Sequence, residues 1–180
     1  CPICKQPATE RFGLKLFCGF EHAAEWAKNA QDKRRAKEKA ETRRKDREKL
    51  KALKTRSEFL KELQVIFNRF IRLRDAGLPC ISCGAPDDGS RQMQAGHYKT
   101  VGAHPALRFD EKNCHSQCSR CNNFLSGNLL PYRAALITKI GQAEVDRLEG
   151  KQEPLKLTIA EIQALIAEYK SKVKALSGHT

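Results

Sequence analysis

The chain has 180 residues, of which 34 are Lys or Arg and 21 are Asp or Glu, giving a formal net charge of +13 at pH 7. This length allows one or two small domains, and the charge indicates a polyanionic partner, with nucleic acid expected before an anionic membrane surface. The sequence has no run of about 18 apolar residues and no signal-peptide pattern, which argues against a membrane-spanning or secreted protein. It begins at Cys1 without Met, so we expect native residues before it.

Residues 1–22 predict a small metal-binding module. Six of the eight cysteines in the chain form CxxC pairs, a spacing typical of zinc sites in a lysine-rich chain rather than of disulfides. Cys1, Cys4, Cys18 and His22 offer three thiols and an imidazole, which suit tetrahedral zinc, and so short a segment needs such a cross-link to fold. The alternative is that His22 merely begins the next helix and that the site is unfilled.

Residues 23–75 contain neither Gly nor Pro and predict one long helix. From Lys28 to Arg56 the chain has 14 Lys or Arg against 5 Asp or Glu, a net charge of +9. One interpretation is a basic helix lying along DNA phosphates, and the other is a solvated spacer. Our candidates for DNA binding on this helix are Arg34, Arg35, Arg43 and Arg44.

The second part of this predicted helix is amphipathic. Leu53, Leu60 and Phe67 repeat every seven residues, with further apolar residues beside them. Such a stripe packs either against the core of the same chain or against a partner helix, and in the second case it would form a homodimer. Gly77 then ends the helix.

Residues 76–130 hold a second cysteine set around two predicted strands, RQMQAGHY at 91–98 and KNCHSQC at 112–118. The set has the pattern CxxC–x34–CxxC and consists of Cys80, Cys83, Cys118 and Cys121. Four thiolates close a tetrahedral zinc site, so this zinc is predicted to be structural. It would hold both ends of a hairpin that presents His97 to the start of a following helix, on which Asn122 would lie.

The last part of the chain, residues 131–180, predicts helices at 131–148 and 158–176. The second begins with Thr158 and Glu161 in the spacing of a capping box. We expect these helices to serve packing, and we predict no role for His179 in the tail.

The histidine between the cysteine pairs fits hydrolysis of nucleic acid. Phosphodiester cleavage needs a base that activates water and a hard cation that stabilises the charged transition state. A neutral His97 can be the base, and Asn or Asp oxygens suit Mg²⁺ or Mn²⁺. The alternative is a strand histidine whose ring is satisfied by its neighbours. The flanking CxxC pairs, with Asn113 and Asn122, favour catalysis.

The segments PCISCG, QAGHY, LRFDEKNCHSQCSRCN and SGN resemble the HNH (ββα-metal) endonucleases of the endonuclease VII type. Over nearly its whole length, including CPIC and FCGFEH, the chain is similar to the lambdoid-phage NinG (Rap) family, recombination endonucleases that act on branched DNA. The resemblance implies a metal-dependent endonuclease that cleaves Holliday junctions in the cytoplasm of the host cell. Other phage recombination proteins would be further partners.

The resemblance also implies roles for single residues. His97 would be the general base, Asn113 would hold the hairpin loop by side-chain hydrogen bonds, and Asn122 would bind the catalytic Mg²⁺ or Mn²⁺. The chain departs from the family pattern at Gly96, where many relatives have a metal-binding Asp. The missing ligand must therefore come from another residue.

Our first candidate for this ligand is His115, because it lies two residues from Asn113 and hence on the same strand face. Asp110 and His104 are weaker candidates. An imidazole ligand would also tolerate Zn²⁺ or Ni²⁺, so the identity of the cation stays open. By the same alternation, we expect Cys114 to be buried on the opposite face, the alternative being a fifth thiol near the zinc.

Three more cations lie close to the motif in the sequence. Lys99, Arg108 and Arg120 are candidates for contacts with the scissile phosphate, although each could equally be a surface charge. The expected fold is mostly α-helical, with a zinc knuckle, a long basic helix and a small zinc-bound ββα-metal module. Two other functions stay open: a non-catalytic zinc protein that binds nucleic acid, and an HNH nicking endonuclease with sequence preference.

Overall fold

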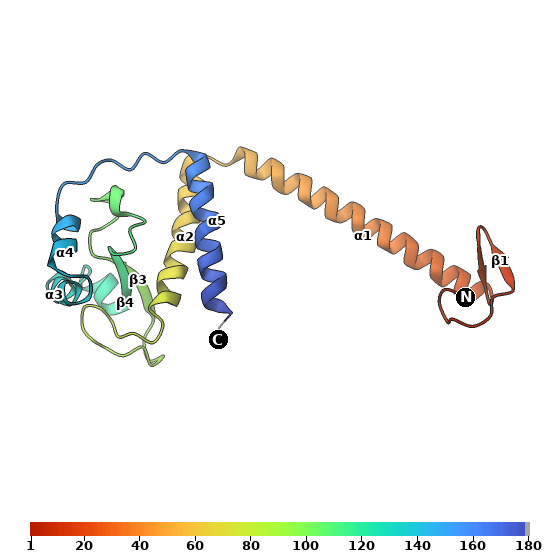
Figure 1. The fold of residues 1–180 in the computed structure, drawn as a ribbon, viewed down its shortest axis with the longest axis horizontal. Helices are drawn as coiled ribbons and strands as arrows, with labels where there is room; N and C mark the ends of the chain where they lie inside the picture. The colour runs from red at the N-terminus through yellow and green to blue at the C-terminus, as the bar shows by residue number, and fades with distance from the viewer. Residues whose placement is uncertain (179–180) are drawn as a thin grey trace. The chain divides into compact units, whose positions relative to one another are not determined.

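The structure, a computed structural model, describes residues 1–178 apart from the side chain of Lys51, so His179 lies outside the described residues. The chain divides into two compact units, Cys1–Lys54 and Thr55–Thr180. Figure 1 shows that helices predominate and that the strands are short, as the sequence predicts. No helix in the described part of the chain combines the length and the apolar character needed to cross a membrane.

The N-terminal unit is a small hairpin followed by a long helix. Strands β1 (Glu10–Phe12) and β2 (Lys15–Phe17) pair antiparallel, and Gly13 in the turn between them has a φ of +63°, a conformation that favours glycine. Helix α1 (Phe20–Leu53) follows directly. Residues 31–50 of this helix are all exposed, as expected of a polar sequence with no apolar face to bury.

The expectation of one unbroken helix over residues 23–75 is wrong. Helix α2 (Arg56–Arg74) is separate from α1, and Thr55 between them has extended backbone with a ψ of 161°. The Glu58 amide donates to the Thr55 side chain, and the Thr55 amide donates to the Glu58 side chain over 2.7 Å. This capping box starts a new helix, and its T-x-x-E spacing was a readable signal that the absence of Gly and Pro obscured.

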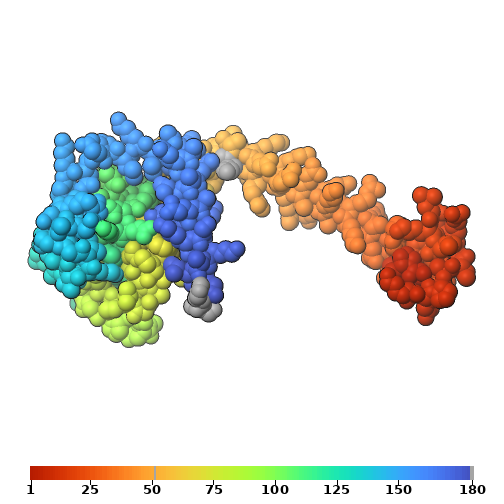
Figure 2. Space-filling model, viewed as in Figure 1, coloured from red at the N-terminus to blue at the C-terminus, as the bar shows by residue number. Residues whose placement is uncertain are grey.

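The C-terminal helix α5 (Ile159–Ser177) begins with the predicted capping box. The amide of Glu161 donates to the Thr158 hydroxyl over 3.3 Å, and the Thr158 amide donates to the Glu161 carboxylate over 2.7 Å. The preceding residues 150–158 form neither helix nor strand. Figure 2 shows this segment in blue on the surface of the unit.

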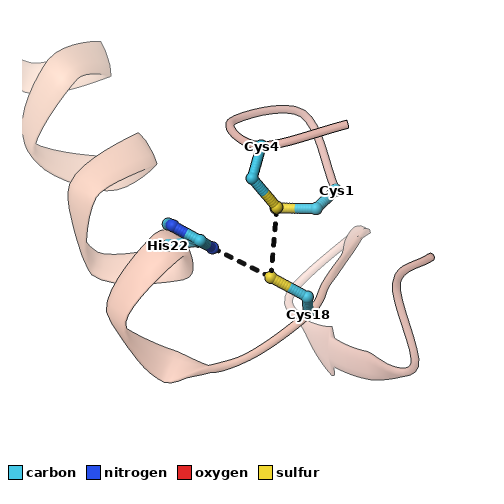
Figure 3. A group of neighbouring side chains, drawn as sticks. All are labelled: Cys1, Cys4, Cys18 and His22. Carbon is cyan, nitrogen blue, oxygen red and sulfur yellow. Dashed lines mark hydrogen bonds between the residues drawn. The ribbon is translucent and has the colours of Figure 1, made fainter. Parts of the chain in front are cut away.

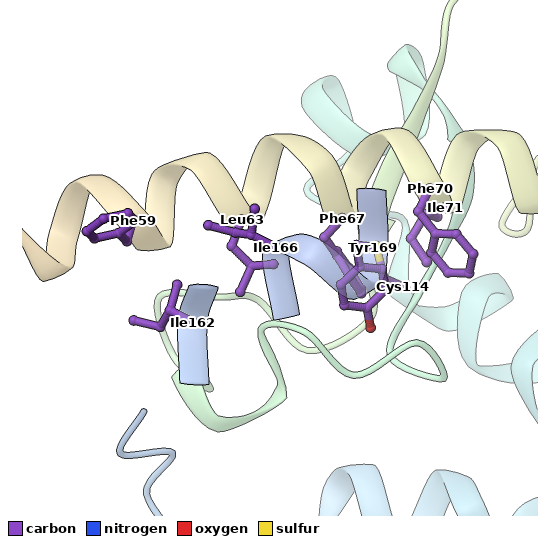
Figure 4. Packing of buried hydrophobic residues seen from close by; sticks show 9 residues of the cluster. All are labelled: Phe59, Leu63, Phe67, Phe70, Ile71, Cys114, Ile162, Ile166 and Tyr169. Atoms are coloured by element: carbon purple, nitrogen blue, oxygen red, sulfur yellow. The ribbon is translucent and has the colours of Figure 1, made fainter. Parts of the chain in front are cut away.

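The main core of the C-terminal unit lies between α2 and α5 (Figure 4). Phe67 is fully buried and Leu60 packs against the same core, whereas Leu53 belongs to the N-terminal unit and is 78% exposed. The α2 part of the apolar stripe therefore packs within the chain and is not free to form a partner surface. The buried members of the cluster are Phe59, Leu63, Phe67, Phe70, Ile71, Cys114, Ile162, Ile166 and Tyr169.

Both predicted strands of the hairpin are present. Strand β3 (Met93–His97) pairs antiparallel with β4 (Cys114–Cys118), so that His97 lies opposite Cys114. The loop between them contains a short 3₁₀ turn, η1 (Pro105–Leu107). Side chains of α2 and α5 cover one face of this hairpin, because Ala95 and Cys114 belong to the core between those helices.

The predicted helix over residues 131–148 is divided in two. A π-helical turn, η2 (Arg120–Phe124), follows β4 and precedes α3 (Leu129–Ile140) and α4 (Gln142–Glu149). Gly141 separates the two helices with a φ of +86°, which a non-glycine residue rarely adopts. These helices form a second core with the hairpin loop, made of Tyr98, Leu107, Tyr132, Leu136, Val145 and Leu148.

Candidate functional site

The N-terminal unit brings together the four predicted ligands Cys1, Cys4, Cys18 and His22, whose donor atoms all lie within 4.8 Å of one another. Figure 3 shows His22 in the first turns of α1, directed towards Cys18, with 2.8 Å between its Nδ1 and the Cys18 Sγ. The Cys18 Sγ is 3.4 Å from the Cys4 Sγ. His22 thus begins the helix and also completes a group that could hold a metal ion.

The second predicted set is also assembled. Cys80, Cys83, Cys118 and Cys121 place their sulfur atoms within 4.8 Å of one another, and all except Cys83 are buried. All eight cysteines of the chain are free thiols, so no disulfide competes with metal binding. Both groups have the donors of a closed tetrahedral zinc site.

Hydrogen bonds reach two of the sulfur atoms in this second set, whereas burial raises the pKa of Cys83 and raises that of Cys121 to about 12. Burial opposes ionisation of Cys80, but backbone N–H groups, first that of Cys118 at 3.3 Å and then those of Cys83 and Ser82, lower its pKa to about 7. The side-chain amide of Asn128 donates to the Cys121 Sγ over 3.4 Å. Such donors stabilise thiolates, the form in which cysteine binds metal.

His97 is the last residue of β3, and its ring faces the α2–α5 core. The ring centroid is 6.1 Å from that of Phe67, and Nε2 lies 3.0 Å from the carbonyl oxygen of Arg108. Since a carbonyl only accepts, Nε2 carries the proton and Nδ1 is left as an acceptor, 3.6 Å from the Cys114 Sγ. Burial lowers the pKa of His97, so the ring is neutral at pH 7.

Asn113 makes the loop contacts that the sequence predicts. Its Oδ1 accepts from the backbone N–H of Lys99 over 2.8 Å, and its Nδ2 donates to the carbonyls of Lys99 and Leu107 over 3.0 and 3.1 Å. The side chain is fully buried, so these three bonds satisfy it and fix the start and the middle of the hairpin loop.

Asn122 lies on the η2 turn, directly after Cys121, where its Nδ2 donates to the Oε1 of Gln94 over 2.7 Å. Gln94 and His97 are three residues apart in β3, so their side chains point to opposite faces of the hairpin. The structure therefore anchors Asn122 to the hairpin but on the face opposite His97.

Both ring nitrogens of His115 have partners within the protein. It is 3% exposed, its Nδ1 lies 3.0 Å from the Arg74 guanidinium and 3.6 Å from the Asp75 carboxylate, and its Nε2 is 3.1 Å from the Lys112 carbonyl. Burial lowers the pKa of this imidazole. With both nitrogens engaged, the geometry does not support His115 as the substitute metal ligand.

The weaker candidates for this ligand do not form a metal group either. Asp110 pairs with Arg147 at 2.9 Å, and His104 precedes the η1 turn. Among residues 1–178, the two Cys-containing sets are the groups of three or more His, Cys, Asp or Glu side chains that could hold a metal ion.

Asp75, at the end of α2, anchors the hairpin and was missed by sequence reasoning. It is 2% exposed, and its carboxylate accepts from Arg74 at 2.8 Å and from the Ser116 backbone N–H at 2.9 Å. Burial opposes ionisation, but bonds from His115, Arg74 and Ser116 hold the pKa of Asp75 well below its usual range. The Asp75 carboxylate thus ties α2 to β4.

Gln117 is a second residue that sequence reasoning missed, and it explains Gly96. The fully buried Gln117 amide donates to the Ser82 hydroxyl over 2.6 Å and to the Gly127 carbonyl over 2.5 Å. A Cβ on Gly96 would lie 2.1 Å from the Gln117 Oε1, so the side chain of Gln117 fills the space above this glycine. That Oε1 has no hydrogen-bond partner among the described residues. A Gln directly before a metal-ligand cysteine in a buried strand was the available signal.

The residues predicted to contact phosphate differ in whether their charged groups already have partners within the protein. The Arg108 guanidinium donates to the Gln64 side chain over 2.7 Å, and the Lys99 ammonium lies 5.1 Å from the Tyr98 ring centroid. Arg120 is exposed. The four candidate arginines of α1, Arg34, Arg35, Arg43 and Arg44, are also exposed, and one of them pairs with Glu48 at 3.9 Å (Arg44). Cys114 is fully buried, as predicted, and burial raises its pKa.

The fold and these groups define a basic, mostly helical protein with two Cys-rich sets that could each hold a metal ion, consistent with zinc. The whole described chain, residues 1–178, matches the model of the family described as Bacteriophage Lambda NinG protein. The chain belongs to this NinG family.

Its relatives are phage proteins. "Protein ninG" of Escherichia phage 933W is 43% identical over 187 residues, covering 98% of this chain and 92% of that protein. The protein of the same name from Escherichia phage lambda is 51% identical over 125 residues, covering 69% of this chain and 60% of that protein. "Protein ninG" of Enterobacteria phage H19B is 42% identical over 189 residues, with 98% and 92% covered. No solved structure matches the chain.

Proposed function

We propose that this protein is a metal-dependent endonuclease of the HNH type that cleaves Holliday junctions and other branched DNA. One observation carries the proposal: the Cys80/Cys83/Cys118/Cys121 set joins the segment before the hairpin to the end of β4 and to the η2 turn. This places a neutral histidine at the end of β3 and an asparagine directly after the last cysteine. The same parts, in the same chain order, make up the HNH motif that the sequence resembles.

Zinc is the metal that we propose for both Cys-rich sets. The donors are three thiols and an imidazole in one set and four thiols in the other, and each set is compact enough for one tetrahedral ion. A closed set leaves no position for substrate, so both sites would be structural. Their part in function is to fix the N-terminal knuckle and the hairpin.

In the proposed reaction, His97 takes a proton from the attacking water at Nδ1, since Nε2 is bound to the Arg108 carbonyl. Asn113 keeps the hairpin loop in place while this happens. The Asn122 side-chain oxygen, with Gln94 beside it, would hold Mg²⁺ or Mn²⁺. The cation would neutralise charge on the phosphate that is cleaved.

The test compares His97→Ala with the parent on a four-way junction and on a duplex of the same sequence, with Mg²⁺ or Mn²⁺. Loss of a general base lowers the rate by about 10²–10⁴. DNA binding should stay near the parental value, because a neutral ring contributes no charge. His104→Ala, which removes a histidine that ends no strand, is the matched control and should cleave like the parent. Near-parental cleavage by folded His97→Ala protein would disprove this role.

A second candidate function is DNA binding without cleavage. The packing of His97 against Phe67 and its bond to Arg108 favour this alternative, since they satisfy a purely structural histidine. Junction binding without cleavage under any tested cation would establish it. Cleavage of duplex at defined sequences would instead favour a nicking enzyme with sequence preference. A homodimer, other phage recombination proteins as partners and the host cytoplasm as location remain parts of the first proposal.

A further inference from the structure

The segment that follows the second cysteine set exposes several large apolar side chains. Phe124 is 79% exposed and Leu130 is 86% exposed, while Leu125 and Leu129 between them are 46% and 45% exposed. We call these four residues the apolar rim. They lie within eight residues of Asn122, the proposed cation ligand, so the rim borders the proposed site. Four exposed large apolar residues within one seven-residue segment of so polar a chain indicate a binding surface.

The backbone beneath the rim is fixed. Ser126, Gly127 and Asn128 all have positive φ, of 49°, 88° and 45°, a conformation that two non-glycine residues adopt only where surrounding contacts impose it. The contacts are present: Gln117 and Ser82 both donate to the Gly127 carbonyl, and Asn128 donates to the Cys121 Sγ. The rim is therefore held in one conformation before any ligand arrives, which lowers the entropic cost of binding.

The chemistry of the rim favours an unpaired nucleobase over an aliphatic partner. Phe124 is the aromatic residue of the rim, and Arg120 lies four residues before it, about one turn away on η2. The Arg120 side chain is exposed and makes no hydrogen bond or ion pair within residues 1–178. An exposed aromatic ring with an unpaired arginine about one turn away is a combination that can bind an unstacked base and its phosphate. The net charge of +13 makes DNA, rather than a second copy of this basic chain, the complementary partner.

We propose that Phe124 stacks on an unpaired or unstacked base beside the scissile phosphate, with Arg120 on the adjacent phosphate. Paired bases inside a duplex cannot reach an exposed ring in this way, whereas branch points, gaps and bulges offer such bases. The rim would thus give the protein its preference for branched over linear DNA. The position of Phe124 beside a scissile phosphate rests on the proposed function. The binding test of this inference does not require cleavage.

The test measures binding without added Mg²⁺ or Mn²⁺ and without chelator, so that structural zinc is kept and no cleavage occurs. The probe is 2-aminopurine placed as the unpaired base of a bulged duplex and at the crossover of a four-way junction. A fully paired duplex of the same sequence is the reference. Stacking on Phe124 changes the fluorescence of the unpaired probe. Phe124→Ala should remove that change and weaken binding to the bulge and junction by about 5-fold or more, leaving duplex affinity unchanged.

Two variants separate stacking from structure. Phe124→Trp keeps an aromatic ring and should retain both the fluorescence change and the preference. Val65→Ala removes an aliphatic side chain of α2 that is 69% exposed and lies outside the rim, and it should change neither. An unchanged ratio of bulge to duplex affinity in Phe124→Ala would overturn the inference. A dimeric parent and a monomeric Phe124→Ala variant would also overturn the inference, because the rim would then be an interface between two copies of the chain. Lack of cleavage by the parent, with stacking intact, would count against the endonuclease proposal alone.

Discussion

The two units of this chain use similar Cys-rich sets in different surroundings. In the N-terminal unit the buried apolar side chains are Phe17 and Ala23, and all four candidate ligands are partly exposed. In the C-terminal unit the cysteines lie beside two apolar cores and beside buried polar anchors such as Asp75. The comparison indicates that a bound metal would supply most of the folding energy of the first unit. In the second unit, a bound metal would join parts of a fold that has its own core.

Removing one candidate ligand from each set should produce the largest difference between the two units. Cys18→Ser should unfold residues 1–22, since zinc binding to small knuckles is worth about 10–16 kcal/mol, while the melting temperature of the C-terminal unit stays unchanged. Cys118→Ser should loosen the hairpin but leave the α2–α5 core folded. Hydrogen exchange measures both effects by region.

Zinc content provides the control for these variants. The parent should bind about two zinc ions per chain and each ligand variant about one. Cys114→Ser changes a buried cysteine outside both sets and should keep both ions. Loss of the α2–α5 core in the zinc-depleted Cys118→Ser protein would contradict the comparison.

The anchor at Asp75 tests the claim that the C-terminal unit is stabilised without metal. Asp75→Asn removes the charge partner of Arg74 and replaces one of the two carboxylate oxygens that accept from this guanidinium with an NH2 donor, which should cost about 3–5 kcal/mol in urea unfolding. Asp32→Asn, on the exposed part of α1, should be neutral.

The pH dependence of the Asp75 variant has a definite sign. Because the folded-state pKa of Asp75 is lowered, its contribution is complete above the unfolded-state pKa of about 3.9 and is lost as pH falls below it. The stability difference between parent and Asp75→Asn should therefore shrink under acid conditions. A difference that grows towards low pH would contradict this assignment.

A side chain at Gly96 tests how tightly the hairpin is packed. Gly96→Asp would place its Cβ 2.1 Å from the Gln117 Oε1, so Gln117 must move and its bonds to Ser82 and Gly127 must break. We expect a loss of about 1–3 kcal/mol, as for other overpacked cores. Gly96→Asp with Gln117→Gly should recover part of it. Gly102→Asp, where no atom lies within 4 Å of the Cβ position, is the control and should be near neutral.

The salt dependence of DNA affinity tests whether the charges of α1 contact DNA more than those of the C-terminal unit do. Changing Arg34, Arg35, Arg43 and Arg44 to Gln should lower the slope of log affinity against log salt by up to about 0.9 for each lost phosphate contact. The matched control removes four exposed charges from the C-terminal unit, through Lys61→Gln, Arg69→Gln, Lys151→Gln and Lys156→Gln. Equal slopes in the two variants would mean that α1 is only a solvated spacer.

Features that depend on neighbours in the sequence could be predicted from the sequence. The spacing of the cysteines identified both ligand sets, because CxxC turns bring two thiols together locally. The alternation of residues 91–98 and 112–118 identified the strands, and the Thr158 capping box identified the start of α5. The Thr55 capping box was equally readable and was passed over.

Tertiary structure alone decided how these parts face one another. Sequence spacing cannot tell which face of the hairpin meets α2, and that contact turns His97 towards Phe67 while Asn122 binds Gln94 on the other face. It also cannot pair residues that lie far apart in the chain. The bond between Arg74 and His115 therefore became visible only in the fold, where burial forces each polar group to find a partner. Gly96 was readable as a missing ligand, but only packing revealed that Gln117 fills the space above it.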